Sequence, residues 1–151
     1  MVTDYSSFRE RLRNCEPLLG TILSLPSPEV AEICAEAGFD WLFVDMEHGL
    51  LIPADVQRMI QAVAERCPCI VRVPENDPAW VGRILDTGAS GLIFPHVNSA
   101  KEAGTAVRAA MYPPQGDRSI GPARALGYGM RIRETLIRAN EDTILVVQAE
   151  H

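Results

Sequence analysis

The sequence predicts an α/β fold, a (β/α)8 TIM barrel of which this chain covers about the first five strands. Three observations lead to this prediction. Short apolar segments alternate with amphipathic helical segments along the whole chain, and the apolar segments are rich in β-branched residues on both faces, which is typical of a parallel sheet covered by helices. The unit also recurs about every 25 to 35 residues, as in a (β/α) barrel.

Proline and glycine mark the ends of the predicted strands. Pro26 ends the first strand and Pro74 ends the third, because proline cannot donate a hydrogen bond to a neighbouring strand. No glycine-rich phosphate loop follows the first strand, so a doubly wound sheet is the weaker alternative. The predicted strands cover residues 18–25, 41–45, 69–73, 91–94 and 143–148.

Helix caps lie between these strands. Ser27 is suited to cap a helix over 29–37, which Gly38 ends, and the spacing of Val30, Ile33, Cys34 and Ala37 predicts that they form its buried face. A long loop rich in glycine, proline and arginine is expected over 112–129. The other predicted helices cover residues 53–66, 78–86, from Asn98 or Ser99 to 111, and 131–139.

Length and composition indicate one domain over residues 1–151. The chain has 151 residues, of which 47% are hydrophobic and 23% charged, which is enough for a single core. A complete barrel of this type needs about 250 residues. We therefore expect a single barrel domain truncated after the fifth strand, which is either a fragment of a longer protein, the favoured reading, or a set completed by strands from elsewhere.

Charge and apolar patterning exclude several classes of protein. The formal net charge of −6 and the absence of a basic stripe argue against a nucleic-acid partner. No apolar run approaches the ~18 residues of a membrane helix, and the N-terminal segment lacks the apolar core of a signal peptide. The four cysteines have neither zinc nor redox spacing, so small buried or half-buried thiols in a reducing cytoplasm are expected.

Polar side chains lie at or just after the carboxyl ends of four of the predicted strands. Parallel strands of a barrel place their catalytic groups at these ends. A carboxylate there is a ligand for Mg²⁺, an arginine can hold an enolate oxygen, and a histidine beside a carboxylate is a general base. These residues suit proton abstraction or carbon–carbon bond chemistry next to a carbonyl. They are Asp45, Glu47, His48, Arg72, His96, Gln148, Glu150 and His151.

Five separated motifs resemble the HpcH/HpaI aldolase family, which contains metal-dependent class II pyruvate aldolases acting on 4-hydroxy-2-oxo acids such as 4-hydroxy-2-oxoheptanedioate and 2-dehydro-3-deoxyglucarate. The resemblance covers nearly the whole chain, in order. The motifs are GFDWLFVDMEHG, VRVPENDP, ILDTGASGLIFPHV, YPPQGDRSIGPARALGYG and LVVQAE.

The resemblance implies a role for each matching residue. His48 is similar to the proton acceptor of the family, and Arg72 to the arginine that stabilises the enolate of bound pyruvate. Gln148 resembles the substrate-binding glutamine and Glu150 the first metal ligand, for Mg²⁺, Mn²⁺ or Co²⁺. Asp45, close to His48 in the sequence, is expected to orient His48 or the substrate.

Asp86 matches the family aspartate that raises the basicity of the histidine. Because Asp86 precedes the fourth strand, it lies at the wrong end of its own barrel to reach His48. A neighbouring subunit would have to supply it, in agreement with the homo-oligomers of the family, which are trimers or hexamers.

Two departures from the family pattern bear on function. The family's second metal ligand is an aspartate on the sixth strand, which is not within the 151 residues, and His96 stands where an apolar residue is common. His96 either tunes substrate choice or is incidental.

The main hypothesis is an aldolase that joins pyruvate to an aldehyde or catalyses the reverse cleavage. The alternatives are oxaloacetate decarboxylase or another lyase activity at the same site, and a truncated, non-catalytic relative that acts as an oligomerising domain.

Overall fold

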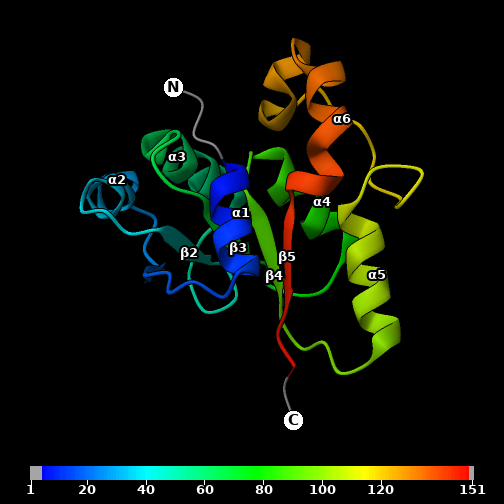
Figure 1. Cartoon of the computed structure of the whole chain (residues 1–151), viewed down its shortest axis with the longest axis horizontal. Coiled ribbons are helices and arrows are strands. Elements are labelled where there is room, and N and C mark those ends of the chain that lie inside the picture. Colours follow the sequence, from blue (N-terminus) through cyan, green and yellow to red (C-terminus); the bar gives the residue numbers. More distant parts are fainter. Residues whose placement is uncertain (1–4, 150–151) are drawn as a thin grey trace.

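The chain forms a five-stranded parallel sheet in the computed structural model, which describes residues 5–149 (Figure 1). The strand order is β1-β2-β3-β4-β5, so each strand pairs with its neighbours in the sequence, as in a (β/α) barrel. This confirms the predicted fold class. The strands are β1 (Gly20–Leu23), β2 (Trp41–Asp45), β3 (Cys69–Arg72), β4 (Gly91–Phe94) and β5 (Ile144–Val147).

Helices connect the strands, and polar caps begin three of them. The hydroxyl of Ser27 accepts the backbone N–H of Val30, the carboxylate of Asp77 that of Ala79, and the hydroxyl of Ser99 that of Glu102. The helices are α1 (Tyr5–Arg13), α2 (Pro28–Glu36), α3 (Pro53–Val63), α4 (Pro78–Asp86), α5 (Ala100–Ala110) and α6 (Ile132–Asp142), and η1 (Arg124–Gly129) is a short 3₁₀ segment.

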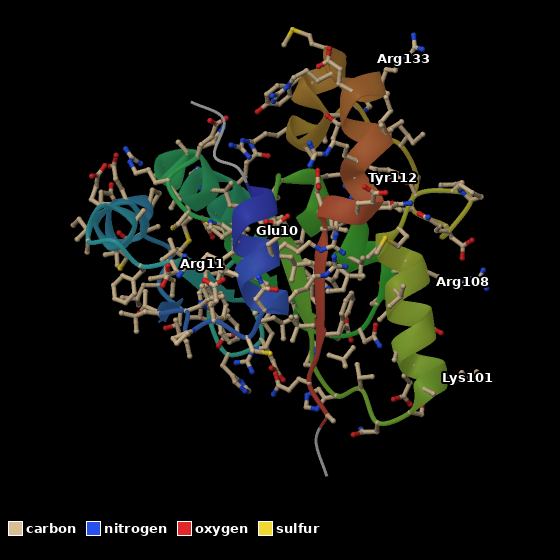
Figure 2. The ribbon with its side chains drawn as sticks, viewed as in Figure 1. Glu10, Arg11, Lys101, Arg108, Tyr112 and Arg133 are labelled. Carbon is tan, nitrogen blue, oxygen red and sulfur yellow. The ribbon has the colours of Figure 1, made fainter. Side chains whose placement is uncertain are left out.

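The two faces of the sheet pack against different elements. The larger core lies between the sheet and the connecting helices and includes Leu42, Val44, Val71 and Phe94. On the opposite face a smaller apolar cluster gathers Ile70, Ile93 and Ile144 against Phe8 of α1, which lies across the sheet in Figure 1. Arg11 of α1, labelled in Figure 2, pairs with Asp40 at 2.7 Å just before β2. Helix α1 is therefore fixed to the sheet by apolar packing and by charge.

Strand register determines which residues meet at the carboxyl ends. In the β2–β3 pair, Leu42 is the partner of Cys69 and Asp45 is the partner of Arg72. Asp45 and Arg72 are thus neighbours at the last paired position, because successive side chains alternate between faces and partners in register point the same way.

The structure corrects the predicted buried face of α2. Val30 and Ile33 are 38% and 65% exposed, Ala37 is exposed and Cys34 is only half-buried. Ala31 and Ala35 are buried instead, because their small side chains allow the helix to approach the core closely. Apolar spacing defined the helix but not which stripe of it faces inward.

Two segment boundaries also differ from the prediction. The expected loop over 112–129 contains η1, in which Gly127 and Tyr128 have positive φ and so end any regular helix there. Helix α3 ends at Val63 rather than at Arg66. Ala64 has a φ of 53°, and the Arg66 side chain folds back to donate to the carbonyl of Ala62.

The cysteines are free thiols, and the prediction that they are buried or half-buried is correct for three of them but wrong for Cys15. Cys15 is exposed, Cys34 is half-buried, and Cys67 and Cys69 are buried. Burial raises the pKa of Cys67 to about 11 and that of Cys69 to about 12. These two thiols are therefore protonated near neutral pH and unsuited to nucleophilic chemistry. Among residues 5–149, no helix has the length and apolarity to cross a membrane.

Candidate active site

The segment after β2 folds around the side chain of Asp45, which is 6% exposed. Its Oδ1 accepts the backbone N–H groups of Glu47 at 3.1 Å and His48 at 3.3 Å, so the chain turns tightly at the strand end. Gly49 is required in this turn because a Cβ there would collide with the carbonyl oxygen of Asp45. The turn places Glu47 and His48 directly beside the strand tip.

Arg72, the last residue of β3, binds Asp45 through two parallel contacts. Its Nε donates to Oδ1 at 2.9 Å and its Nη2 donates to Oδ2 at 2.7 Å. The guanidinium carbon also lies 5.2 Å from the centre of the Phe43 ring. This two-pronged geometry fixes the guanidinium in position and orientation.

Glu47, which the sequence placed among the strand-end candidates without assigning it a role, makes a second carboxylate contact with Arg72. Its side chain is 8% exposed, and Oε2 lies 3.0 Å from Nη1 of Arg72. Nε2 of His48 is 3.9 Å from the same oxygen, whereas Nε2 of His96 is 2.9 Å from Oε1. The sequence signal for Glu47 was its position two residues after Asp45, the acid that ends an apolar strand.

Gln148, which follows β5, brings a fourth strand end to the site. Its Oε1 accepts a hydrogen bond from Nη1 of Arg72 at 3.2 Å. Its backbone is held at the same place, because its N–H donates to the carbonyl of Phe94 at 2.9 Å and its carbonyl accepts the N–H of Val97 at 3.0 Å. Arg72 therefore contacts residues from the ends of β2 and β5.

Opposing effects determine the charge state of Asp45. Burial raises the pKa of Asp45, but the hydrogen bonds and charge of Arg72, together with the backbone N–H groups of His48 and Glu47, lower it by more. The pKa is therefore below its ordinary value, and Asp45 is an anion that keeps the guanidinium in place at neutral pH.

This arrangement places a cation, a buried acid pair, an amide and a solvent-facing imidazole at one end of a parallel sheet. His48 is 73% exposed, so its ring is accessible to a ligand, whereas Arg72 is 12% exposed. Such an arrangement can stabilise a developing negative charge at the guanidinium and transfer a proton at the imidazole.

Comparison with known proteins shows the family of the chain. Residues 19–151 match the family model described as HpcH/HpaI aldolase/citrate lyase. The chain belongs to the HpcH/HpaI family.

Proteins named as aldolases are similar to the chain over almost all of its length. It is 42% identical to a hydroxypyruvate/pyruvate aldolase of Paraburkholderia phytofirmans, a match that covers 99% of the chain and 60% of that protein. It is 39% identical to a 4-hydroxy-2-oxovalerate aldolase of Novosphingobium aromaticivorans, covering 99% of the chain and 58% of that protein. The chain thus spans about three fifths of the length of these relatives.

The fold agrees with an HpcH/HpaI crystal structure. A family protein from Burkholderia cenocepacia superposes with a TM-score of 0.88 at 40% identity, covering 94% of the chain and 58% of that protein. The five parallel strands therefore correspond to part of the barrel of this family member.

Asp86 lies apart from the other predicted site residues. It ends α4 immediately before β4 begins, whereas Arg72 and Glu47 lie at the opposite, carboxyl ends of the strands. In this chain its Oδ1 accepts a hydrogen bond at 2.9 Å from Arg118, whose guanidinium stacks on Tyr112 at 4.4 Å. Tyr112 is labelled in Figure 2. Among the described contacts of the chain, Asp86 pairs with Arg118 and not with His48, as its position before the fourth strand predicted.

The described residues do not form a metal centre by themselves. Within residues 5–149, no group of three or more His, Cys, Asp or Glu side chains is arranged to hold an ion, and both Asp45 and Glu47 are paired with Arg72. The predicted ligand Glu150 lies outside the described residues, as does His151. The role of Glu150 in metal binding therefore stays a prediction.

Proposed function

We propose that the protein containing this chain is a class II pyruvate aldolase that cleaves or forms 4-hydroxy-2-oxo acids through the enolate of pyruvate. The observation that carries this proposal is the placement of Arg72 between Asp45, Glu47 and Gln148, with His48 beside Glu47. Aldolases among its relatives, including those named for hydroxypyruvate, pyruvate and 4-hydroxy-2-oxovalerate, support the substrate class.

Each residue has a defined role in the proposed reaction. His48, exposed beside the acid pair, removes a proton from the methyl group of pyruvate. Arg72 faces the negative charge that develops on the enolate oxygen, and its two carboxylate partners hold it ready, so no reorganisation is needed. Gln148 orients the keto acid next to Arg72. In cleavage His48 takes the proton of the 4-hydroxyl group, the bond between carbons 3 and 4 breaks to release the aldehyde and the pyruvate enolate, and His48 returns the proton to the enolate. In synthesis the same steps run in reverse, so the protonated His48 gives its proton to the alkoxide formed from the aldehyde.

A divalent cation, Mg²⁺, Mn²⁺ or Co²⁺, bound with Glu150 as a ligand would add Lewis-acid stabilisation of the enolate. We propose in addition that Asp86 acts on His48 of a neighbouring copy in a homo-oligomer. The carbon nucleophile attacks an aldehyde, which is the second small-molecule substrate.

Substitution of the two central residues tests the proposal. In the full-length protein, His48→Ala and Arg72→Ala are each expected to lower kcat/KM for cleavage of 4-hydroxy-2-oxo acids at least about a hundredfold, because each removes a group that acts in the transition state. A coupled assay for released pyruvate measures this. Arg108→Ala is the control, since Arg108 is exposed on α5 and pairs only with an equally exposed aspartate among the described residues. Rates like wild type in both site variants would contradict the proposal.

Removal of metal tests the role of Glu150. Treatment of the full-length protein with EDTA is expected to abolish cleavage, and added Mg²⁺, Mn²⁺ or Co²⁺ should restore it. Glu150→Gln should raise the metal concentration needed for half-maximal rate by at least about tenfold, because an amide is a weaker ligand for a hard cation than a carboxylate. Full activity after EDTA would exclude the metal-dependent class. Parallel assays with oxaloacetate distinguish an aldolase from a decarboxylase that uses the same enolate.

A further inference from the structure

We propose that His96 is a positioning residue of this active site: it holds the carboxylate of Glu47, and Glu47 in turn places Arg72 and His48. The inference rests on the proposed aldol reaction for its kinetic consequences. Its structural part depends only on the contacts among these four side chains.

The contact between His96 and Glu47 joins strand ends that are not neighbours. Glu47 follows β2 and His96 follows β4, with β3 and its terminal Arg72 between them in the sheet. Nε2 of His96 nevertheless lies 2.9 Å from Oε1 of Glu47, the distance of a charge-assisted contact. The two side chains therefore bridge the ends of β2 and β4, which lie on either side of β3.

The position of Glu47 matters for the site because its carboxylate lies beside both Arg72 and His48. Its carboxylate is 92% buried, and Oε2 makes no hydrogen bond to the described residues although it lies 3.0 Å from Nη1 of Arg72. A buried carboxylate needs hydrogen-bond or charged partners, because burying it without them is costly. The imidazole of His96 on Oε1 directs Oε2 toward Arg72 and His48.

The backbone at His96 supports this interpretation. His96 has a φ of 53° directly after Pro95, a left-handed conformation that side-chain-bearing residues seldom adopt. Such conformations persist where surrounding contacts compensate for them and are concentrated at functional sites. The contact with Glu47 provides such compensation at the mouth of the candidate site.

Two substitutions at one position separate a positioning role from a merely structural one. In the full-length protein, His96→Leu removes the ring nitrogen that lies 2.9 Å from Glu47, whereas His96→Gln keeps an amide nitrogen at similar reach. Leu and Gln are equally disfavoured at positive φ, so backbone effects cancel between them. We expect His96→Leu to lower kcat for hydroxy-oxo acid cleavage about tenfold with little change in KM, and His96→Gln to remain within about threefold of wild type.

Dependence on Glu47 is the second test. If His96 acts through Glu47, the effect of His96→Leu should disappear in a Glu47→Ala background, as a double-mutant cycle measures. Should Glu47→Ala not fold, Glu47→Gln takes its place, since it removes the charge at unchanged size. Additive effects of the two substitutions would overturn the proposal, as would equal losses in the Leu and Gln variants or no loss in either.

Crystal structures provide a readout that does not depend on activity. We expect the Glu47 carboxylate to leave Arg72 in His96→Leu and to keep its position in His96→Gln. If wild type cleaves no hydroxy-oxo acid, the proposed function fails, but these structures still decide whether His96 positions Glu47. An unmoved Glu47 in His96→Leu would refute the inference even in an active enzyme.

Discussion

Arg72 illustrates at the scale of one residue why the site is rigid. Its guanidinium is 12% exposed and contacts two carboxylates and an amide from separate strand ends. Burying charges is costly, so Arg72 and its carboxylate partners are stable here only in a geometry that keeps them paired. The position of the guanidinium is consequently over-determined, which is what a group that stabilises a developing negative charge requires.

The Asp45–Arg72 pair should contribute to stability in a pH-dependent manner. We expect Asp45→Asn to lower the free energy of unfolding at pH 7 by about 3 kcal/mol, because it leaves the buried Arg72 with one carboxylate fewer. The pKa of Asp45 is lower in the folded protein than the value of about 3.9 in an unfolded chain. Its stabilising contribution is therefore complete above that unfolded value and is lost as the pH falls through the folded one.

Urea unfolding of wild type and Asp45→Asn at pH 7 and in steps below pH 4 measures this effect. The difference between the two proteins should narrow as the solution becomes more acidic, since Asp45 of the wild type then becomes neutral as well. A difference that is the same at every pH would show that the lowered pKa of Asp45 does not contribute.

The residue scale also shows what the sequence could predict about the site. Asp45 and Arg72 were predictable, because each ends an apolar strand and parallel strands bring their carboxyl ends together. The contact of Glu47 with His96 was not, since it depends on the turn after β2 and on a positive φ at His96. No spacing rule relates residues that follow non-adjacent strands.

At the scale of elements, sequence patterns located the segments better than their faces. The five strands and the long helices lie where period and caps predicted them, because Pro, Gly and Ser act locally on the backbone. The buried stripe of α2 depends instead on which neighbours the helix meets. Those neighbours are distant in the sequence, so Val30 and Ile33 were wrongly predicted to be buried.

Two glycines in different elements should respond to alanine in opposite ways. In β4, a Cβ on Gly91 would press against the backbone of Ile144 in β5, so Gly91→Ala should destabilise the fold by about 1–3 kcal/mol. In α5, a Cβ on Gly104 meets nothing within 4 Å, so Gly104→Ala should stabilise it by about 0.5–1 kcal/mol. Denaturant unfolding of both variants measures the two changes in the free energy of unfolding. A loss of stability in Gly104→Ala would contradict this view of α5, and an unchanged Gly91→Ala would contradict the close approach of β4 and β5.

At the scale of the whole molecule, the sheet separates the predicted partners His48 and Asp86. His48 lies at the carboxyl ends of the strands, whereas Asp86 lies at the amino end of β4 and binds Arg118. If Asp86 serves the proposed reaction, it does so in another copy of the chain.

Complementation between inactive variants tests this arrangement. His48→Ala and Asp86→Asn should each impair the full-length enzyme, but co-expression should restore part of the activity, because mixed oligomers contain sites with both native residues. Differently tagged subunits confirm that mixing has occurred. Activity that stays at the level of the single variants in verified mixed oligomers would exclude an action of Asp86 across subunits.

The pairing of Asp45 with Arg72 also bears on how the register of β2 and β3 is selected during folding. A slip by one residue between these strands would send one of the two side chains into the helix layer. The apolar residues of these strands could exchange faces at modest cost, since those on the second face are buried or half-buried, whereas a charge inside the helix layer would be costly. Asp45 and Arg72 therefore also disfavour a shifted register of β2 and β3. Substitutions that neutralise both residues should give chains that still become compact but populate more than one register.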